Sequence, residues 1–259
     1  MRPALTMAPR WRPLEELRAA IALLTRLPVP GPSPTSGGAS AFGLVGALVG
    51  ATGGIPILLV GDTAPLAAAG LALAAMALVT GALHLDGLAD TADALASIGP
   101  GAAERARSDP LIGAARGVAV ALIVVLDAGW LAALVERSGV LAAALAYVSA
   151  GAASRATVVV LVTLAPSGRR GASGGWFSST AGPRAALIGG ASAALVVILV
   201  AVAADDVALA SGAVAGSLAG LGAGLWLIHA RAGIDGDLLG ATVEIASMSV
   251  LGATVLLAS

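Results

Sequence analysis

Three aspartates fall close together in the segment His84–Leu95, whose sequence is HLDGLADTADAL. If this segment is helical, Asp86, Asp90 and Asp93 stand at i, i+4 and i+7 and therefore share one face. Like charges at this spacing repel one another, and the segment itself contains no Lys or Arg to compensate them. Mg²⁺ prefers carboxylate oxygens together with waters and substrate phosphates, so the spacing favours a metal–phosphate site. The alternative is a solvated acidic helix end that binds nothing.

A second acidic segment precedes the last apolar run of the chain. His229–Gly240 reads HARAGIDGDLLG, in which Asp235 and Asp237 stand among glycines. Either carboxylate is suited to a further contact with a metal or a hydroxyl group. An Asp that opens a helix is also an ordinary N-cap, which is the competing interpretation for one of the two.

Adjacent arginines occur in a glycine- and serine-rich segment. Pro166–Pro183, PSGRRGASGGWFSSTAGP, contains Arg169 and Arg170. Backbone N–H groups and guanidinium groups in such a loop can gather phosphate oxygens. The same arginines can instead serve only to hold the loop on one side of a membrane, and both interpretations stay open.

Several ionisable residues lie inside apolar runs. Glu244 stands one to two turns inside the last run, where a charged group is costly and is therefore a functional candidate. Arg155 and Asp127 lie in two neighbouring runs at depths that differ by about seven residues, or ~10 Å, so the sequence does not predict a direct pair. His84 and His229 are too few for a zinc site, and an interfacial role is the simpler interpretation for each.

The composition determines the class of protein in which these residues are held. The chain has 259 residues, of which 58% are apolar and 11% charged, and its mean hydropathy is +0.96. These values exclude an ordinary soluble domain and predict an all-α, polytopic membrane bundle. Seven apolar runs approach the ~20 residues needed to cross a bilayer. They are approximately Phe42–Val60, Pro65–Leu83, Leu111–Val135, Val140–Ala165, Ala185–Ala203, Val207–His229 and Leu238–Ala258.

The chain is expected to form a single membrane domain, 1–259. Residues 1–27 form a basic, amphipathic segment at the membrane surface, because Trp11–Leu27 places Leu14, Leu17, Ile21 and Leu24 on one helical stripe. A secretory signal is the competing interpretation, but the apolar patch is short. Residues 28–40 are rich in proline and glycine and form a loop, and 41–259 form the transmembrane bundle.

Glycines at four-residue spacing mark two faces for close helix packing. They are Gly46, Gly50 and Gly54 in the first run, and Gly212, Gly216, Gly220 and Gly224 in the sixth. The alternative is that glycine is simply abundant in this chain, which has 35 of them.

Arginines predict the orientation in the membrane, because cytoplasmic loops retain positive charge. With a cytoplasmic N-terminus, the loops on the cytoplasmic side contain Arg105, Arg107, Arg169, Arg170, Arg184 and Arg231. The opposite side receives Arg137 together with Asp62, Glu136, Asp205 and Asp206. The three aspartates, the arginine loop and the second acidic segment then face the same compartment.

At HLDGLADTADAL the chain resembles the cobalamin synthase family, the adenosylcobinamide-GDP ribazoletransferases, which have a similar H-x-DGLADTAD segment. Further similarities, in the expected order over most of the chain, are LLTRLPVP at Leu23–Pro30, FGLVGALVG at Phe42–Gly50, the pair Ser154–Arg155, and GDLLGATVE at Gly236–Glu244. Two segments depart from the family pattern. Asp109–Gly117 is longer than usual and has an extra arginine, Arg116, and Ala232–Asp237 reads AGIDGD where Gly-Gly-x-Thr-Gly-Asp is common.

The resemblance implies a transferase of substituted phosphate groups in the inner membrane of a bacterium. A ribose hydroxyl of α-ribazole, or of its 5′-phosphate, would attack the phosphorus that carries the corrinoid aminopropanol group of adenosylcobinamide-GDP and expel GMP. Asp86 and Asp90 would bind Mg²⁺, Asp93 would complete its shell or accept the hydroxyl proton, and Asp237 would contribute from the opposing loop. The residues expected to bind substrate are His84, Arg155, Arg169, Arg170 and Glu244. The lipid bilayer is an expected partner and nucleic acid is not, while a homo-oligomer stays open.

Two other functions compete with this one. A CDP-alcohol phosphotransferase also clusters aspartates at a cytoplasmic helix end, but its DG-x2-AR signature fails here because Asp90 follows Ala89. A transporter would use Asp127, Arg155 and Glu244 to line a path. No inverted repeat supports that function, and the acids cluster at one face.

Overall fold

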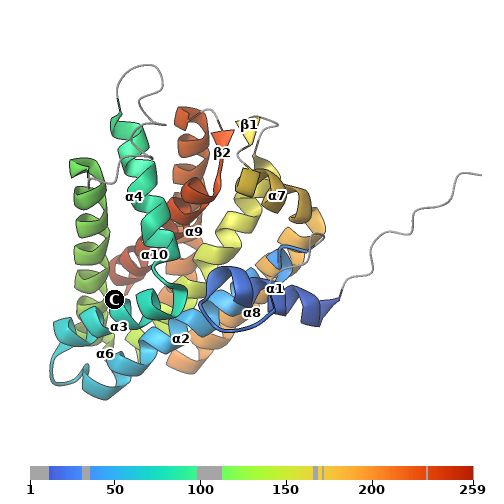
Figure 1. Ribbon diagram of the computed structural model, residues 1–259. Coiled ribbons are helices and arrows are strands. Elements are labelled where there is room, and N and C mark those ends of the chain that lie inside the picture. Colours follow the sequence, from blue (N-terminus) through green and yellow to red (C-terminus); the bar gives the residue numbers. More distant parts are fainter. Residues whose placement is uncertain are drawn as a thin grey trace, which may run out of the picture.

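The computed structural model describes residues 12–30, 36–97, 113–165, 169–170, 172–231 and 233–258, and these form a bundle of helices with one pair of very short strands (Figure 1). The α-helices are α1 (Pro13–Leu24), α2 (Phe42–Val60), α3 (Pro65–Thr80), α4 (Leu83–Ala96), α6 (Ala114–Leu164), α7 (Ala172–Thr180), α8 (Pro183–Ala204), α9 (Val207–Arg231) and α10 (Gly236–Leu257). A 3-10 helix, η1 (Ala39–Ala41), precedes α2, and the strands are β1 (Arg169–Arg170) and β2 (Gly233–Ile234). The predicted all-α membrane bundle is confirmed. The predicted loop arginines Arg105 and Arg107 lie outside the described residues.

Five helices in the described part of the chain are long and apolar enough to span a membrane. They are α2 with η1, α6, α8, α9 and α10, and a sixth span results if α3 and α4 are counted as one. The predicted number of seven is therefore not confirmed. Part of the difference is that α6 is counted as one span here. Its 51 helical residues are more than one bilayer crossing needs.

The long helix α6 is broken at Gly139. This residue has φ +85° and ψ 167°, a conformation that is not helical and that glycine adopts readily because it lacks a Cβ. The two halves of α6 are separate helices in Figure 1, coloured green and yellow-green. The break falls between the two apolar runs that the sequence predicts for this region.

The apolar helix α3 and the acidic helix α4 meet at a bend of 93°. The bend consists of Gly81 and Ala82, both with positive φ. Arg26, which follows α1, holds this corner: its backbone N–H donates to the carbonyl of Val79 at 2.7 Å, and its guanidinium occupies the space that a Cβ of Gly81 would need. The predicted run Pro65–Leu83 thus ends at Thr80, and the aspartates lie on a helix of their own.

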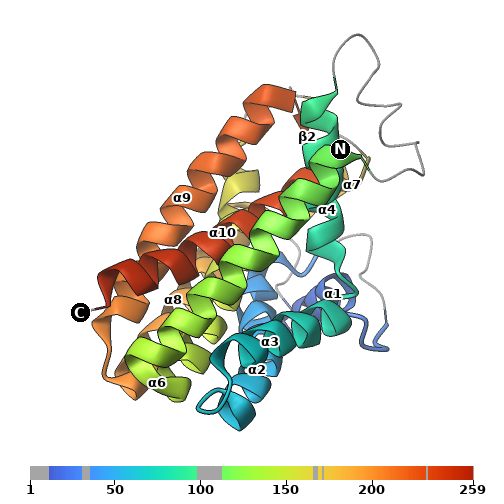
Figure 2. The same cartoon turned by 90° about the vertical axis from the view of Figure 1, so that its left-hand side faces the viewer.

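Both predicted glycine faces are close helix contacts. An added Cβ at Gly46 would clash with the backbone of Gly151 in α6. On α9, Gly212, Gly216, Gly220 and Gly224 meet α10 at Thr254, Val250, Ala246 and Thr242 respectively. Figure 2 shows α9 and α10 lying side by side. Small residues at these faces let the backbones approach and gain van der Waals contact that bulky side chains would prevent.

Helix α1 lies within the predicted amphipathic segment, and its inner face packs on the bundle. Ala20 and Leu24 are buried, whereas Leu14 is 75% exposed. Glu16 accepts hydrogen bonds from the hydroxyl groups of Ser36 at 2.5 Å and Ser40 at 2.8 Å, which hold α1 against η1 and the loop before it. The helix is thus fixed to the protein on one side.

The α9–α10 contact predicts different effects for two glycines of the same helix. Gly216→Ala places a Cβ against the backbone of Val250, so we expect it to destabilise the protein by about 1–3 kcal/mol through overpacking. Gly222→Ala meets nothing within 4 Å and should be neutral or slightly stabilising, because Ala has the higher helix propensity. Thermal unfolding of both variants in detergent is the measurement. Equal melting temperatures would contradict the close contact.

Candidate functional site

The three predicted aspartates lie on one helix, as their spacing indicates. Asp86 stands in the first turn of α4, where its negative charge is favourable, and it is exposed. Asp90 is half-buried and Asp93 is buried. The three carboxylates therefore form a series that runs from solvent into the protein.

Arg116, the extra arginine noted in the sequence, provides a positive charge for these carboxylates. It stands in the first turn of α6, and its Nε donates to Oδ2 of Asp93 at 2.9 Å. Its backbone N–H donates to the other oxygen of Asp93, also at 2.9 Å, and its Nη2 pairs with Asp90. The expectation that this face lacks a compensating cation was wrong, because the cation comes from the next helix, 23 residues beyond Asp93. No local spacing in the sequence signals such a pair.

The carboxylates still suit a magnesium ion. No group of three or more acidic or histidine side chains that could share one ion occurs in the described ranges. Mg²⁺ is usually held by one or two carboxylates, and substrate phosphates and water complete its shell. Asp93 uses both oxygens on Arg116, whereas Arg116 bonds to one oxygen of Asp90. Asp86 and the second oxygen of Asp90 therefore provide a donor set of the right chemistry.

The second acidic segment meets the first where α4 crosses α10. A Cβ added to Gly87 would lie 2.7 Å from the carbonyl oxygen of Asp237 and 3.2 Å from Cα of Gly240. A side chain at Gly87 would force the helices apart, and a Cβ on Gly240 would also be tight, at 3.3 Å from Cα of His84. Asp237 therefore begins α10 directly beside the residue that follows Asp86.

Asp235 has the structural role that the sequence offered as an alternative. It is the N-cap of α10 and accepts from the backbone N–H of Leu238 at 2.9 Å. Its other oxygen accepts from Arg231 at 3.0 Å, and Arg231 also donates to Thr91 of α4 at 3.3 Å. Arg231 thus joins the ends of α9 and α10 to the acidic helix.

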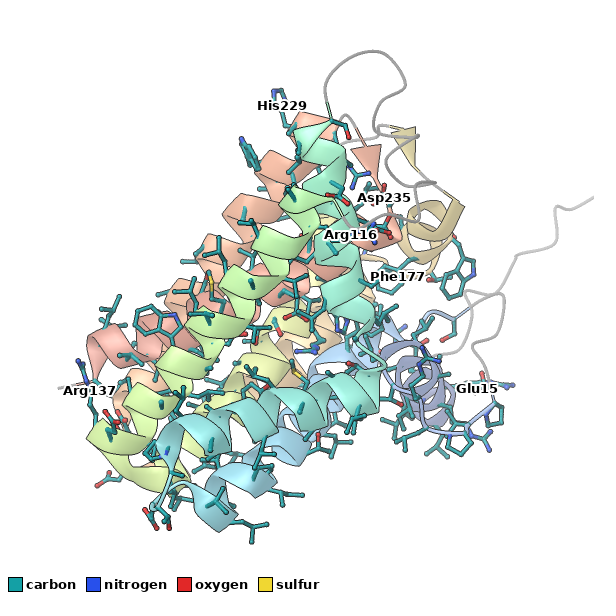
Figure 3. The ribbon with its side chains drawn as sticks, turned by 60° about the vertical axis from the view of Figure 1, so that its left-hand side comes forward. Glu15, Arg116, Arg137, Phe177, His229 and Asp235 are labelled. Carbon is teal, nitrogen blue, oxygen red and sulfur yellow. The ribbon has the colours of Figure 1, made fainter. Side chains whose placement is uncertain are left out.

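The arginine loop comes to the same end of the bundle. Strand β1 pairs in parallel with β2, so that Arg169 is opposite Gly233 and Arg170 opposite Ile234. The side chains of both arginines lie outside what the structure describes, and their binding of phosphate stays a prediction. Figure 3 shows Arg116 and Asp235 near this end, with Arg137 at the opposite end of the molecule.

Two cavities adjoin Asp86. The larger has a volume of about 1010 Å³, and Arg26 and Arg116 are among its lining residues. The smaller has a volume of about 350 Å³ and is lined by Trp176, Phe177 and Asp237, among others. Leu23, Leu83 and Asp86 contribute to both cavities. The Asp86 carboxylate therefore stands where two ligands of different size could meet.

His84 connects the site to the interior of the bundle. It is buried and lines the smaller cavity, and Nη2 of Arg155 lies 3.4 Å from its Nδ1. A guanidinium group can only donate, so Nδ1 accepts and the ring proton is on Nε2. Arg155 also donates to the hydroxyl of Ser154 at 3.1 Å. Arg155 therefore holds the His84 ring in place through its contact with Nδ1.

The two predicted intramembrane acids, Asp127 and Glu244, lie deeper. Glu244 is 2% exposed and interacts electrostatically with Arg155, and Asp127, 1% exposed, interacts with Glu244. Within the described residues, Asp127 Oδ1, Arg155 Nε and Glu244 Oε2 have no hydrogen-bond partner. Neither Glu244 nor Arg155 lines the two cavities at Asp86, so a direct contact of either residue with substrate stays a prediction.

These features define a class: a polytopic helical membrane protein with carboxylates and arginines gathered at one end of its bundle, beside two cavities. The sequence model of the cobalamin-5-phosphate synthase family matches residues 16–255. The chain belongs to this family.

Curated relatives are similar over part of their length. A Rhizobium etli protein named adenosylcobinamide-GDP ribazoletransferase is 40% identical over 153 residues, which cover 54% of this chain and 57% of the relative. A Brucella anthropi protein of the same name is 36% identical over 163 residues, covering 59% and 62% respectively. The chain thus spans less than two thirds of the length of these relatives. No solved structure matches the chain significantly.

The Arg116 contacts predict an energetic coupling between α4 and α6. Arg116→Met removes the cation and Asp93→Asn weakens its main partner, so the double variant should lose about 1–2 kcal/mol less than the sum of the single variants. Denaturant unfolding of the four proteins in detergent measures this coupling. The matched control is the exposed pair Arg12 and Glu15, for which we expect no measurable coupling. A coupling of zero for Arg116 and Asp93 would show that the pair does not form.

Proposed function

We propose that this protein is an adenosylcobinamide-GDP ribazoletransferase. In the reaction, a ribose hydroxyl oxygen of α-ribazole, or of its 5′-phosphate, forms a bond to the phosphorus that carries the corrinoid aminopropanol group. The bond from that phosphorus to the bridging oxygen breaks and GMP leaves. Family membership and the names of the relatives support this activity. The observation that carries the proposal is the position of Asp86, which lines both cavities of a site suited to a two-substrate reaction.

Asp86 and Asp90 are the residues that would hold Mg²⁺ on the diphosphate. When bound, the ion supplies neutralisation of the charge that develops on the leaving phosphate. The protein contributes position, which is the main source of catalysis in phosphoryl transfer. Arg116 keeps Asp90 at a fixed place by its ion pair and leaves Asp86 exposed toward the cavities.

Asp237 is our candidate to accept the hydroxyl proton. It lines the smaller cavity together with Asp86, so a hydroxyl held there lies between two carboxylates. Asp93, the other candidate, already binds Arg116 through both oxygens. We therefore assign to Asp93 the orientation of Arg116. His84, whose Nε2 carries the ring proton, lines the same cavity and is a candidate hydrogen-bond donor to the substrate.

We propose that the site faces the cytoplasm of a bacterium, in its inner membrane. Arg26, Arg116 and Arg231 gather at this end of the bundle, and cytoplasmic segments are enriched in positive charge. Arg137 stands at the opposite end, beside Glu136 in the chain.

Replacement of the aspartates proposed to hold Mg²⁺ tests the mechanism. Asp86→Asn and Asp90→Asn should each lower the rate of GMP release by about 100-fold, the range seen when one electrostatic partner of a transition state is lost. The loss should be smaller at high Mg²⁺ concentration. The assay uses purified protein in lipid vesicles with both substrates, across a series of Mg²⁺ concentrations. Asp62→Asn, an exposed residue at the α2–α3 connection, is the matched control and should behave as wild type.

Two results would contradict these proposals separately. If the wild-type protein releases no GMP from adenosylcobinamide-GDP and α-ribazole, the activity is wrong. If the wild type is active but the Asp86 and Asp90 variants keep its rate and its Mg²⁺ dependence, the activity stands and the metal assignment is wrong.

A further inference from the structure

The two cavities at Asp86 differ in size, charge and wall chemistry, and these differences distinguish their ligands. We infer that the smaller cavity is the binding site for the aromatic base of the acceptor nucleoside, with Trp176 and Phe177 as its walls, and that the larger cavity takes the diphosphate donor. This inference rests on the proposed function and assigns each substrate to a place within it.

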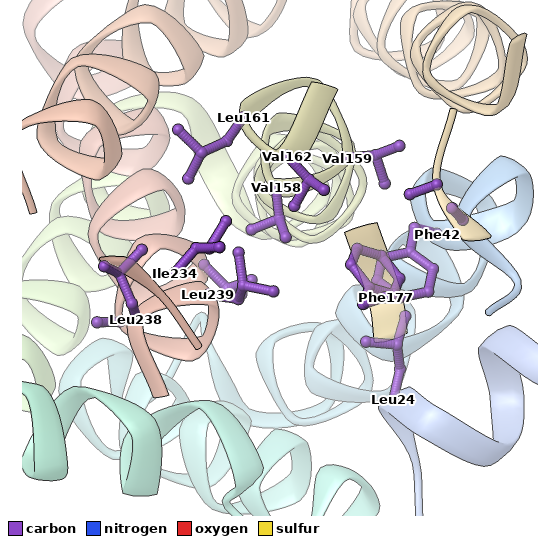
Figure 4. Packing of buried hydrophobic residues seen from close by; sticks show 14 of the residues in the cluster. Leu24, Phe42, Val158, Val159, Leu161, Val162, Phe177, Ile234, Leu238 and Leu239 are labelled. Carbon is purple, nitrogen blue, oxygen red and sulfur yellow. The ribbon is translucent and has the colours of Figure 1, made fainter. Parts of the chain in front are cut away.

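The walls of the smaller cavity form an apolar, aromatic slot. The rings of Phe42 and Phe177 are stacked with their centroids 5.0 Å apart, and both residues line the cavity. Figure 4 shows this pair beside Leu24, with Val158 and Leu239 on neighbouring helices. Trp176 is half-buried at the same wall. Aromatic faces of this kind bind flat bases by stacking.

The polar groups of the smaller cavity are confined to the residues near Asp86. They come from His84, Asp86 and Asp237, whereas the other described lining side chains are apolar. A nucleoside has the same division, with an aromatic base at one end and ribose hydroxyl groups at the other. Bound with its base against the aromatic wall, it directs its hydroxyl groups toward the carboxylates. This is the orientation that the transfer reaction needs.

Guanine is a poor ligand for the smaller cavity, because its polar edge atoms would find no hydrogen-bond partners there. Guanine has several donors and acceptors on its outer edge, and an apolar wall would leave them without partners. The base of α-ribazole is a dimethylated benzimidazole, whose outer edge has methyl groups and no donor. The cavity volume of about 350 Å³ lies at the lower end of the range for small-molecule sites, which fits a nucleoside and not a corrinoid.

The larger cavity has the opposite character. Arg26 and Arg116 line it, and arginine is well suited to bind phosphate oxygens. Its volume of about 1010 Å³ is nearly three times that of the smaller cavity. The attacking and leaving oxygens lie roughly in line across phosphorus, so substrates must approach from two sides. Cavities that meet at Asp86 satisfy this requirement.

Steady-state kinetics of two matched variants test the assignment. Trp176→Ala removes a wall of the smaller cavity and should raise KM for α-ribazole about tenfold, with KM for adenosylcobinamide-GDP unchanged. Trp176→Phe keeps an aromatic wall and should restore most of the affinity. Val120→Trp fills part of the larger cavity, which Val120 lines, and should raise KM for adenosylcobinamide-GDP alone. A higher donor KM in Trp176→Ala, or no change in either KM, would overturn the assignment.

Binding without turnover separates this inference from the proposed function. Equilibrium dialysis of the intact protein in detergent with α-ribazole alone should show binding to the wild type, and weaker binding to Trp176→Ala. If that difference is found but no GMP is ever released, the subsite stands and the transfer activity is wrong. If the wild type releases GMP while α-ribazole binds equally to wild type and Trp176→Ala, the activity stands and the subsite is wrong. Absence of both binding and turnover in the wild type overturns both.

Discussion

The crossing of α4 and α10 at Gly87 and Gly240 is the contact on which the site depends. Because neither residue has a Cβ, the two helices approach until the backbone at Asp237 touches Gly87. Asp86 and Asp237, which are far apart in the chain, thereby line one cavity. Larger residues at the crossing would push the two helices apart and separate these two residues. The site is thus a consequence of backbone packing between small residues, which is how membrane helices associate in general.

Charge balance is the second constraint. An acidic helix at the edge of an apolar bundle needs positive partners, because unpaired carboxylates that are partly buried are costly. Arg116 serves the buried end of the series, at Asp90 and Asp93, and Arg231 links α4 to the start of α10 through Thr91 and Asp235. Asp86, at the exposed end, is solvated and does not need such a partner. The division leaves the most accessible carboxylate for a ligand and gives the others the task of fixing its helix.

The bend between α3 and α4 sets where the acidic helix lies relative to the membrane-spanning bundle. A straight continuation of α3 would direct the aspartates away from the bundle, whereas the 93° turn at Gly81 and Ala82 directs α4 along α10 and the start of α6. Arg26 fills the corner and also lines the larger cavity. The segment after α1 therefore has two roles, in shaping the acidic helix and in forming the wall beside it.

The sequence by itself determined the membrane class, the acidic helix face and the glycine contact faces, because each follows from composition or from spacing within one helix. It also indicated that either Asp235 or Asp237 is an N-cap, without deciding which. It did not predict the partners that come from other helices. The aspartate segment itself contains no compensating cation, and Arg116 reaches it from α6. Trp176 and Phe177 gave no local signal that they would line a cavity with Asp86. It also treated α3 as an apolar run up to Leu83, because a turn of two residues interrupts hydrophobicity too briefly to be seen. Tertiary structure decided these features, since helical periodicity describes which residues share a face and not which face of another helix they meet.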